Sequence, residues 1–375
     1  MTGSPSGLPP LRPADLHAAS DGPLVLAAHG FRFFGIQHLS APHGTVVRGQ
    51  SCVTYYVPQA LTQPWPVVMI HGGGGQALDF MGTADGRPGW LHAFLRRGHA
   101  VYLMDRPGHG RAPYHADSLG PMTSLPPFEA LGPLFARPEW TPERYPQAAR
   151  HNQWPEVEDA AARDLLADPF LTQFMASGGP MMTDMAQAHL DAQRGGAELL
   201  DAIGPAILLT HSAGGPAGWM IADARPELVK AIVAVEPQGP PFAERPGGTL
   251  DWGLTAAPLT FEPPAVTPAE LGREVRPAPS ADLADCLVQA APARRLPNLS
   301  GFPIVVVTAE ASWMAADNHG IVDFLAQAGA QVEHLRLEDR GLHGNGHAMM
   351  LERNSAAVAA LLLDWLAGRG LARPA

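Results

Sequence analysis

The residues best suited to covalent chemistry lie in the segment 205–215, Pro-Ala-Ile-Leu-Leu-Thr-His-Ser-Ala-Gly-Gly. Its apolar run stops at Ser212, which small residues follow, and this pattern predicts a strand, a sharp turn and the start of a helix. Such a turn strains the serine backbone and exposes the hydroxyl. The usual G-x-S-x-G pattern is incomplete, because Thr210 stands at the first glycine position. A serine that merely caps a helix is therefore the alternative interpretation.

A serine nucleophile needs an imidazole to accept its proton and an anion to orient that imidazole. His343 and His347 lie in one glycine-rich loop near the C-terminus, and Glu236 and Glu310 each follow a predicted strand. From position alone, either glutamate could be the acid. The two histidines are four residues apart, a spacing that could hold a metal on a helix, but the intervening Gly-Asn-Gly argues against a helix. No metal and no other cofactor are expected.

A run of four glycines follows His71 directly after an apolar segment. Glycines in this position leave backbone N–H groups accessible and allow a substrate to approach closely. On its own, a glycine run also fits a flexible loop. Beside a nucleophilic serine, it suggests donors for a developing negative charge.

The elements that would position these residues follow from short apolar runs and glycine stops. Strands are predicted at 31–39, 51–57, 65–70, 100–104, 205–211, 229–235, 302–308 and 331–337, and helices at 89–97, 183–200, 213–224, 320–328 and 356–366. Their alternation predicts an α/β fold with a doubly wound, mostly parallel sheet and helices on both faces. The carboxyl ends of parallel strands share one edge, where ligands bind. All the candidate residues should therefore meet there.

Three segments depart from the regular alternation. Residues 1–28 are rich in proline and are expected to form an extended arm in front of one domain at 29–375. An insertion at about 112–204 is expected to form a lid that shapes a pocket. An irregular excursion is expected at about 238–300. Met349, Met350, Trp219, Trp313 and residues of the insertion could line an apolar pocket, although such residues are often core.

The bulk composition limits the partners. The formal net charge is −11 and the sequence has no basic patch, which argues against nucleic acid as a partner. Its longest strongly apolar runs are far too short to span a bilayer. The N-terminal region has no signal-peptide pattern, and the two cysteines have no metal or redox spacing. A cytoplasmic location is therefore expected, although a secreted form from which a leader has been removed would look the same.

Five motifs together resemble an α/β-hydrolase, in which serine, acid and histidine follow one another in this order. They are His-Gly-Gly-Gly-Gly at 71–75, Asp-Arg-Pro-Gly-His-Gly-Arg at 105–111, Thr-His-Ser-Ala-Gly at 210–214, Val-Glu-Pro at 235–237 and His-Gly-Asn-Gly-His at 343–347. The chain is similar, more narrowly, to bacterial carboxylesterases whose catalytic glutamate follows the sixth strand.

This resemblance implies Ser212 as nucleophile, His347 as base and Glu236 as acid, with the backbone N–H groups of Gly73 and Ala213 as the oxyanion hole. Glu310 stays the alternative acid, because the more usual α/β-hydrolase acid follows the next strand. The implied activity is hydrolysis of a small or medium, apolar ester through an acyl-enzyme. Lactonase, amidase and acyltransferase reactions on the same triad remain alternatives, as does a non-catalytic ligand-binding protein. The expected partner is a small ester, and a homodimer is left open.

Overall fold

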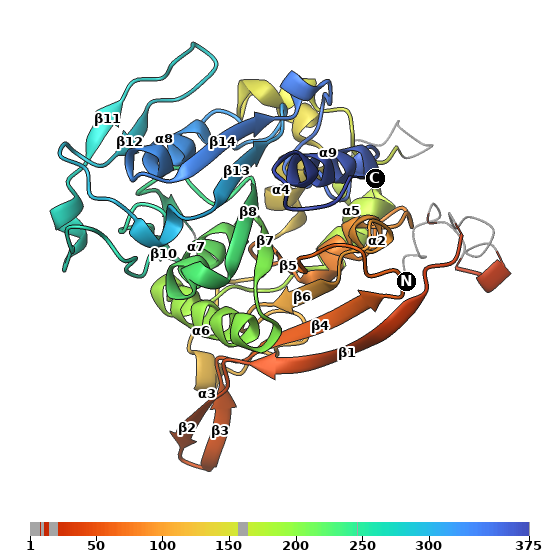
Figure 1. The fold of residues 1–375 in the computed structure, drawn as a ribbon. Helices are drawn as coiled ribbons and strands as arrows, with labels where there is room; N and C mark the ends of the chain where they lie inside the picture. The colour runs from red at the N-terminus through yellow and green to blue at the C-terminus, as the bar shows by residue number, and fades with distance from the viewer. Residues whose placement is uncertain (1–7, 9–10, 15–21, 157–163, 246, 375) are drawn as a thin grey trace.

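The computed structural model describes every residue except 1–7, 9–10, 15–21, 157–163, 246 and 375. An eight-stranded sheet lies at the centre of the described residues (Figure 1), with the strand order β1-β4-β6-β5-β7-β8-β13-β14. These strands are β1 (Leu26–Phe34), β4 (Ser51–Pro58), β5 (Val67–Ile70), β6 (Val101–Asp105), β7 (Ala206–His211), β8 (Val229–Val235), β13 (Pro303–Thr308) and β14 (Gln331–Arg336).

The sheet is mostly parallel. Each neighbouring pair from β6 to β14 is parallel, whereas β4 pairs antiparallel with both β1 and β6. The prediction of a mostly parallel sheet is therefore confirmed, and the structure adds an antiparallel edge. The carboxyl ends of β5, β7, β8 and β13 lie at one edge, where the chain leaves each strand for a loop that carries candidate site residues.

Helices cover both faces of the sheet (Figure 1). The helices of the described residues are α2 (Trp90–Arg96), α3 (Ala116–Leu119), α4 (Phe128–Leu131), α5 (Pro169–Ser177), α6 (Met185–Ile203), α7 (Gly214–Ala224), α8 (His319–Gln327) and α9 (Ser355–Gly368). Leu208 faces a core shared with α6, α7 and α8, whereas its neighbours Ile207 and Leu209 face a core shared with α2 and α9. Side chains alternate across a strand, so a continuous apolar strand serves both layers.

At the amino-terminal edge, the structure corrects the strand predicted at 31–39. β1 ends at Phe34, and the following residues form β2 (Gln37–Ala41), which pairs with β3 (Gly44–Arg48) in a separate hairpin. The break lies at Gly35, where φ is 73° and a Cβ atom would lie 2.9 Å from the backbone of Gly195. Most of the arm predicted at 1–28 falls outside the described residues, and its last residues belong to β1.

The segment between β6 and β7 contributes to two parts of the fold. The long helix α6 packs against α7 and β1, and therefore belongs to the layer that covers the sheet. The preceding part is made of α3, α4, α5 and the short helical turns η2 (Gly132–Ala136), η3 (Pro138–Trp140), η4 (Pro146–Arg150) and η5 (Leu165–Ala167). The division into a domain and a lid remains a prediction.

The segment at 238–300 consists mainly of turns and two short strand pairs. These pairs are β9 (Glu244–Arg245) with β10 (Gly248–Thr249), and β11 (Glu274–Arg276) with β12 (Cys286–Val288). β12 packs against α8. Among the helices of the described residues, none is both long enough and apolar enough to cross a membrane.

Candidate active site

Ser212 occupies the sharp turn between β7 and α7, and its φ angle is 51°. Among the described residues other than glycine, only Glu236 and Phe242 share a positive φ. Space for the turn comes from Gly214, where a Cβ atom would lie 2.6 Å from the carbonyl oxygen of His71. A non-glycine residue in such a conformation costs about 1–3 kcal/mol and persists where its surroundings enforce it. The strain thus falls on Ser212 and Glu236, two of the candidate residues.

Glu236 and His347 form a fully buried hydrogen-bonded pair beside this turn. Nδ1 of His347 lies 2.5 Å from Oε2 of Glu236. The same carboxylate accepts hydrogen bonds from Oγ of Ser312, at 2.5 Å, and from the backbone N–H of Ala309, at 2.8 Å. Hydrogen bonds donated to a carboxylate favour its charged form. Ser312 and Ala309 therefore support an ionised Glu236 that fixes the orientation of the His347 ring.

Burial shifts the pKa of both members of this pair. Burial lowers the pKa of His347, which favours a neutral ring that can accept a proton. Burial also raises the pKa of Glu236 above its ordinary value, and the hydrogen bonds from Ser312 and Ala309 act against that rise. At this separation the two groups titrate as one coupled pair.

The outer nitrogen of His347 is available for chemistry. Nε2, which points away from Glu236, has no hydrogen-bond partner among the described residues, Ser212 included. The rings of Phe135 and Trp313 pack around the imidazole, with centroids 5.1 and 5.0 Å from its own. His211, the residue before Ser212, donates a hydrogen bond from Nε2 to the His347 carbonyl oxygen at 3.0 Å. His211 thereby ties the histidine loop to the serine turn.

The glycine loop lies directly against the serine turn. Residues 72–75 line the same cavity as Ser212. A Cβ atom on Gly73 would lie 3.3 Å from Cβ of Ala213, so the loop and the turn are in close contact at the two predicted oxyanion donors. Nη2 of Arg106 donates a hydrogen bond, 2.7 Å long, to the carbonyl oxygen of the loop's first glycine. That contact anchors the loop to the segment that follows β6.

Glu310, the alternative acid, contacts the other histidine of the loop. Its Oε2 lies 3.2 Å from Nδ1 of His343 and accepts the backbone N–H of Gly344 at 2.9 Å. The guanidinium of Arg150 lies 3.8 Å from its other oxygen, and the His343 side chain is 62% exposed. The structure therefore brings Glu236, and not Glu310, into contact with His347.

A second buried cluster supports the histidine loop, and the sequence analysis missed it. Nδ1 of His151 lies 2.6 Å from Glu139, and its Nε2 lies 2.9 Å from Glu352. Glu352 also accepts hydrogen bonds from the side chain of Asn345 and the backbone of Gly346, the two residues before the candidate base. Burial opposes a charge on His151, but its two carboxylate partners raise its pKa to about 9. A cationic His151 thus joins the insertion to the histidine loop.

No sequence signal marked this cluster, because its members are far apart along the chain. Ser312 was also missed, although its position two residues after Glu310 placed it at the correct strand end. A serine there is one of many polar loop residues, and only its contact with Glu236 distinguishes it.

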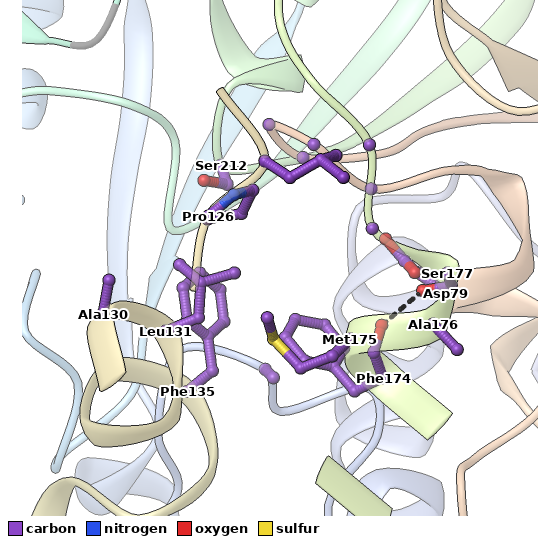
Figure 2. Close-up of a pocket in the computed structure, with 18 of the residues that line it drawn as sticks. Asp79, Pro126, Ala130, Leu131, Phe135, Phe174, Met175, Ala176, Ser177 and Ser212 are labelled. Carbon is purple, nitrogen blue, oxygen red and sulfur yellow. Dashed lines mark hydrogen bonds between the residues drawn. The ribbon is translucent and has the colours of Figure 1, made fainter. Parts of the chain in front are cut away.

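Ser212 opens into a cavity of about 680 Å³ with a mainly apolar lining (Figure 2). Leu131, Phe135, Phe174 and Met175, all from the segment between β6 and β7, surround it. A volume in this range suits a small or medium ligand.

Of the four named residues expected to line an apolar pocket, the structure places only one on the cavity wall. Met350 lines the cavity, whereas Met349 and Trp219 are fully buried in the core. Trp313 instead packs against the ring of His347.

Comparison with known proteins defines the family. Residues 66–269 match the family described as the alpha/beta hydrolase fold. The chain is 38% identical over 320 residues to a protein named as a probable secreted lipase, from Fungal sp. (strain ATCC 74256), with 84% of this chain and 85% of the relative aligned. The chain therefore belongs to the α/β-hydrolase family, among its esterase- and lipase-like hydrolases.

A solved structure gives the same fold. The structure of a bacterial esterase superposes with a TM-score of 0.62 at 24% identity, covering 94% of this chain and 98% of that one. The predicted fold class is thereby confirmed.

The fungal relative overturns the expected cytoplasmic location. The cytoplasmic location predicted from the N-terminal composition is wrong by this comparison, because the homologous fungal protein is named as secreted. The N-terminal composition was a weak guide, because the absence of a signal-peptide pattern does not by itself establish a compartment.

Proposed function

We propose that this protein is a serine carboxylic-ester hydrolase with the triad Ser212, His347 and Glu236, like the bacterial carboxylesterases whose acid follows the sixth strand. The observation that carries the proposal is the buried contact between His347 and Glu236 beside the strained turn at Ser212. The supporting donors from Ser312 and Ala309 favour the charge state that the acid needs.

In the proposed reaction, Ser212 Oγ attacks the ester carbonyl carbon while Nε2 of His347 takes its proton. The N–H groups of Gly73 and Ala213 stabilise the oxyanion, and the leaving alcohol takes the proton back from His347. Water, activated by the same nitrogen, then attacks the acyl-serine and releases the acid. Glu236 stays ionised throughout and orients the imidazole.

The cavity supports a small or medium ester with a largely apolar body. Its aromatic and aliphatic wall would bind acyl or alcohol chains by excluding water. The named lipase relative is in keeping with this class of substrate.

The decisive experiment compares wild type with Ser212→Ala on a graded panel of p-nitrophenyl esters and lactones, with intact mass after a fluorophosphonate probe. We expect a fall in kcat of several orders of magnitude, unchanged thermal stability and one probe adduct that Ser212→Ala lacks. Full activity in Ser212→Ala would refute the nucleophile. Probe labelling without ester turnover would favour another acyl-transfer reaction on the same triad. The absence of both labelling and turnover would favour a ligand-binding protein.

A further inference from the structure

One carboxyl group lines the cavity, and the proposed reaction gives it no task. Asp79 lies in the short helical turn η1 (Ala77–Phe80), which follows the glycine loop. It is the single carboxylic acid among the described residues that form the cavity wall, and it is 8% exposed. Figure 2 shows Asp79 beside Ser177, across the cavity from Ser212.

Asp79 lacks the cation or side-chain donor that usually accompanies a buried carboxylate. In the described part of the chain, no cation pairs with it and no side chain donates a hydrogen bond to it, and a backbone hydrogen bond with Gln76 alone favours its charged form. Nearby Asp105, by contrast, accepts the N–H of Ala77 at 2.7 Å and Nε of Arg111 at 2.8 Å. Burial, and next the charge of Asp105, raise the pKa of Asp79 to about 7.

Three hydroxyl groups on the cavity wall, those of Thr123, Thr172 and Ser177, already take part in hydrogen bonds. Oγ1 of Thr172 donates to the carbonyl oxygen of Asp168 at 3.0 Å, and Oγ of Ser177 donates to that of Phe174 at 2.8 Å. Oγ1 of Thr123 accepts the N–H of Met181. Asp79 therefore brings a carboxyl group without a side-chain partner to a mostly apolar wall, where hydrogen-bonding capacity left unused is costly.

We propose that Asp79 binds a hydroxyl group of the substrate, so that the enzyme prefers esters that carry a hydroxyl on the part of the chain remote from the reacting carbonyl. This inference rests on the proposed esterase function and narrows its substrate class. A hydroxyl fits better than an ammonium group, because a cation would lose its hydration in an apolar cavity that offers it one carboxyl partner. A hydroxyl can pair with either protonation state of Asp79.

The test uses p-nitrophenyl hexanoate and octanoate together with their terminally hydroxylated and terminally aminated counterparts. The readout is the ratio of kcat/KM between the hydroxylated and the plain ester for wild type, Asp79→Asn and Asp79→Leu. Thr172→Val is the matched control, because it alters the same wall at a hydroxyl that is already bonded to the backbone.

We expect wild type to favour the hydroxylated ester by about five- to tenfold for one chain length, the worth of one net hydrogen bond. Asp79→Asn should keep most of this ratio, Asp79→Leu should abolish or invert it, and Thr172→Val should leave it within about twofold. Asp79→Ala carries the comparison if Asp79→Leu does not fold, because it also removes the carboxyl group and its ratio should fall to about one.

Several outcomes would overturn the inference. One such outcome is the same ratio in wild type and Asp79→Leu. Another is a wild-type ratio of one or below at both chain lengths, and a third is a preference for the aminated ester. An equal loss of kcat for all esters would assign Asp79 to support of the glycine loop instead. Failure of the esterase proposal itself looks different, because wild type would then turn over none of the esters or turnover would persist in Ser212→Ala.

Discussion

Two glutamate–histidine pairs lie near the carboxyl ends of β8 and β13, and their histidines, His343 and His347, belong to one loop. The two pairs differ in burial, in distance and in the donors around the carboxylate. Glu236 and His347 are fully buried, 2.5 Å apart, and the carboxylate has two further donors. Glu310 and His343 are 3.2 Å apart, and the histidine is largely exposed to water. Water screens the second pair, whereas the low polarity around the first strengthens each of its contacts.

The comparison shows that a suitable pair of residue types at a strand end does not by itself produce a buried and well-supported pair. Both glutamates follow parallel strands, β8 and β13, at the edge where ligands bind. Only Glu236 sits in a strained conformation with its carboxylate directed at a buried imidazole. Three experiments test whether this difference in surroundings is also a difference in function.

The largest effect is expected from replacing each of the two glutamates by glutamine in turn. Glu236→Gln keeps the size of the side chain but removes the charge that orients His347, and we expect kcat to fall by about 10²–10⁴-fold. Glu310→Gln should change kcat less than about threefold. Initial rates on the best p-nitrophenyl ester, with melting curves of both variants, measure this. The opposite ranking would make Glu310 the acid.

The second expected effect is on the stability that the His151 cluster gives to the loop carrying His347. The pKa of His151 is raised from 6.5 to about 9 in the folded protein, so its stabilisation is complete below pH 6.5 and is lost as the pH rises through about 9. His151→Gln should therefore lower the free energy of unfolding by on the order of 3 kcal/mol at pH 6, and by much less above pH 9. Urea unfolding at both pH values measures the difference.

His343→Gln is the matched control for this experiment, because it removes a histidine from an exposed pair. It should change stability by less than about 1 kcal/mol at either pH. A pH-independent loss of stability in His151→Gln would mean that its packing matters and its charge does not.

The smallest effect is expected from Ser312→Ala. The Ser312 hydroxyl favours the ionised form of Glu236, so its removal should raise the pKa of the coupled pair further. As the pH is lowered, the variant should therefore lose activity earlier than wild type, because Glu236 becomes protonated at a higher pH. The acid limb of the kcat/KM profile should move upward by less than about one pH unit. Ser300→Ala, whose hydroxyl bonds within its own turn, is the control and should leave the profile in place. An unmoved acid limb in Ser312→Ala would show that this hydroxyl does not tune the acid.

Much of the fold could be read from the sequence, because local patterns encode it. Continuous apolar runs marked the buried strands, and helical periodicity marked α2 and α7 to within one or two residues. The failure at 31–39 came from Gly35, whose close approach to Gly195 is a tertiary contact that periodicity does not register. Domain boundaries and site roles remain predictions.

The sequence by itself determined which residues arrive at the carboxyl edge of the sheet, because strand order and parallel pairing place Ser212, both glutamates and the histidine loop there. Only the tertiary structure decided which glutamate contacts His347, that Ser312 and Ala309 support it, and that Asp79 faces the cavity without a side-chain partner. The physical reason is that hydrogen bonds and desolvation depend on distances of a few ångströms between segments far apart in the chain, and residue type and spacing do not fix those distances.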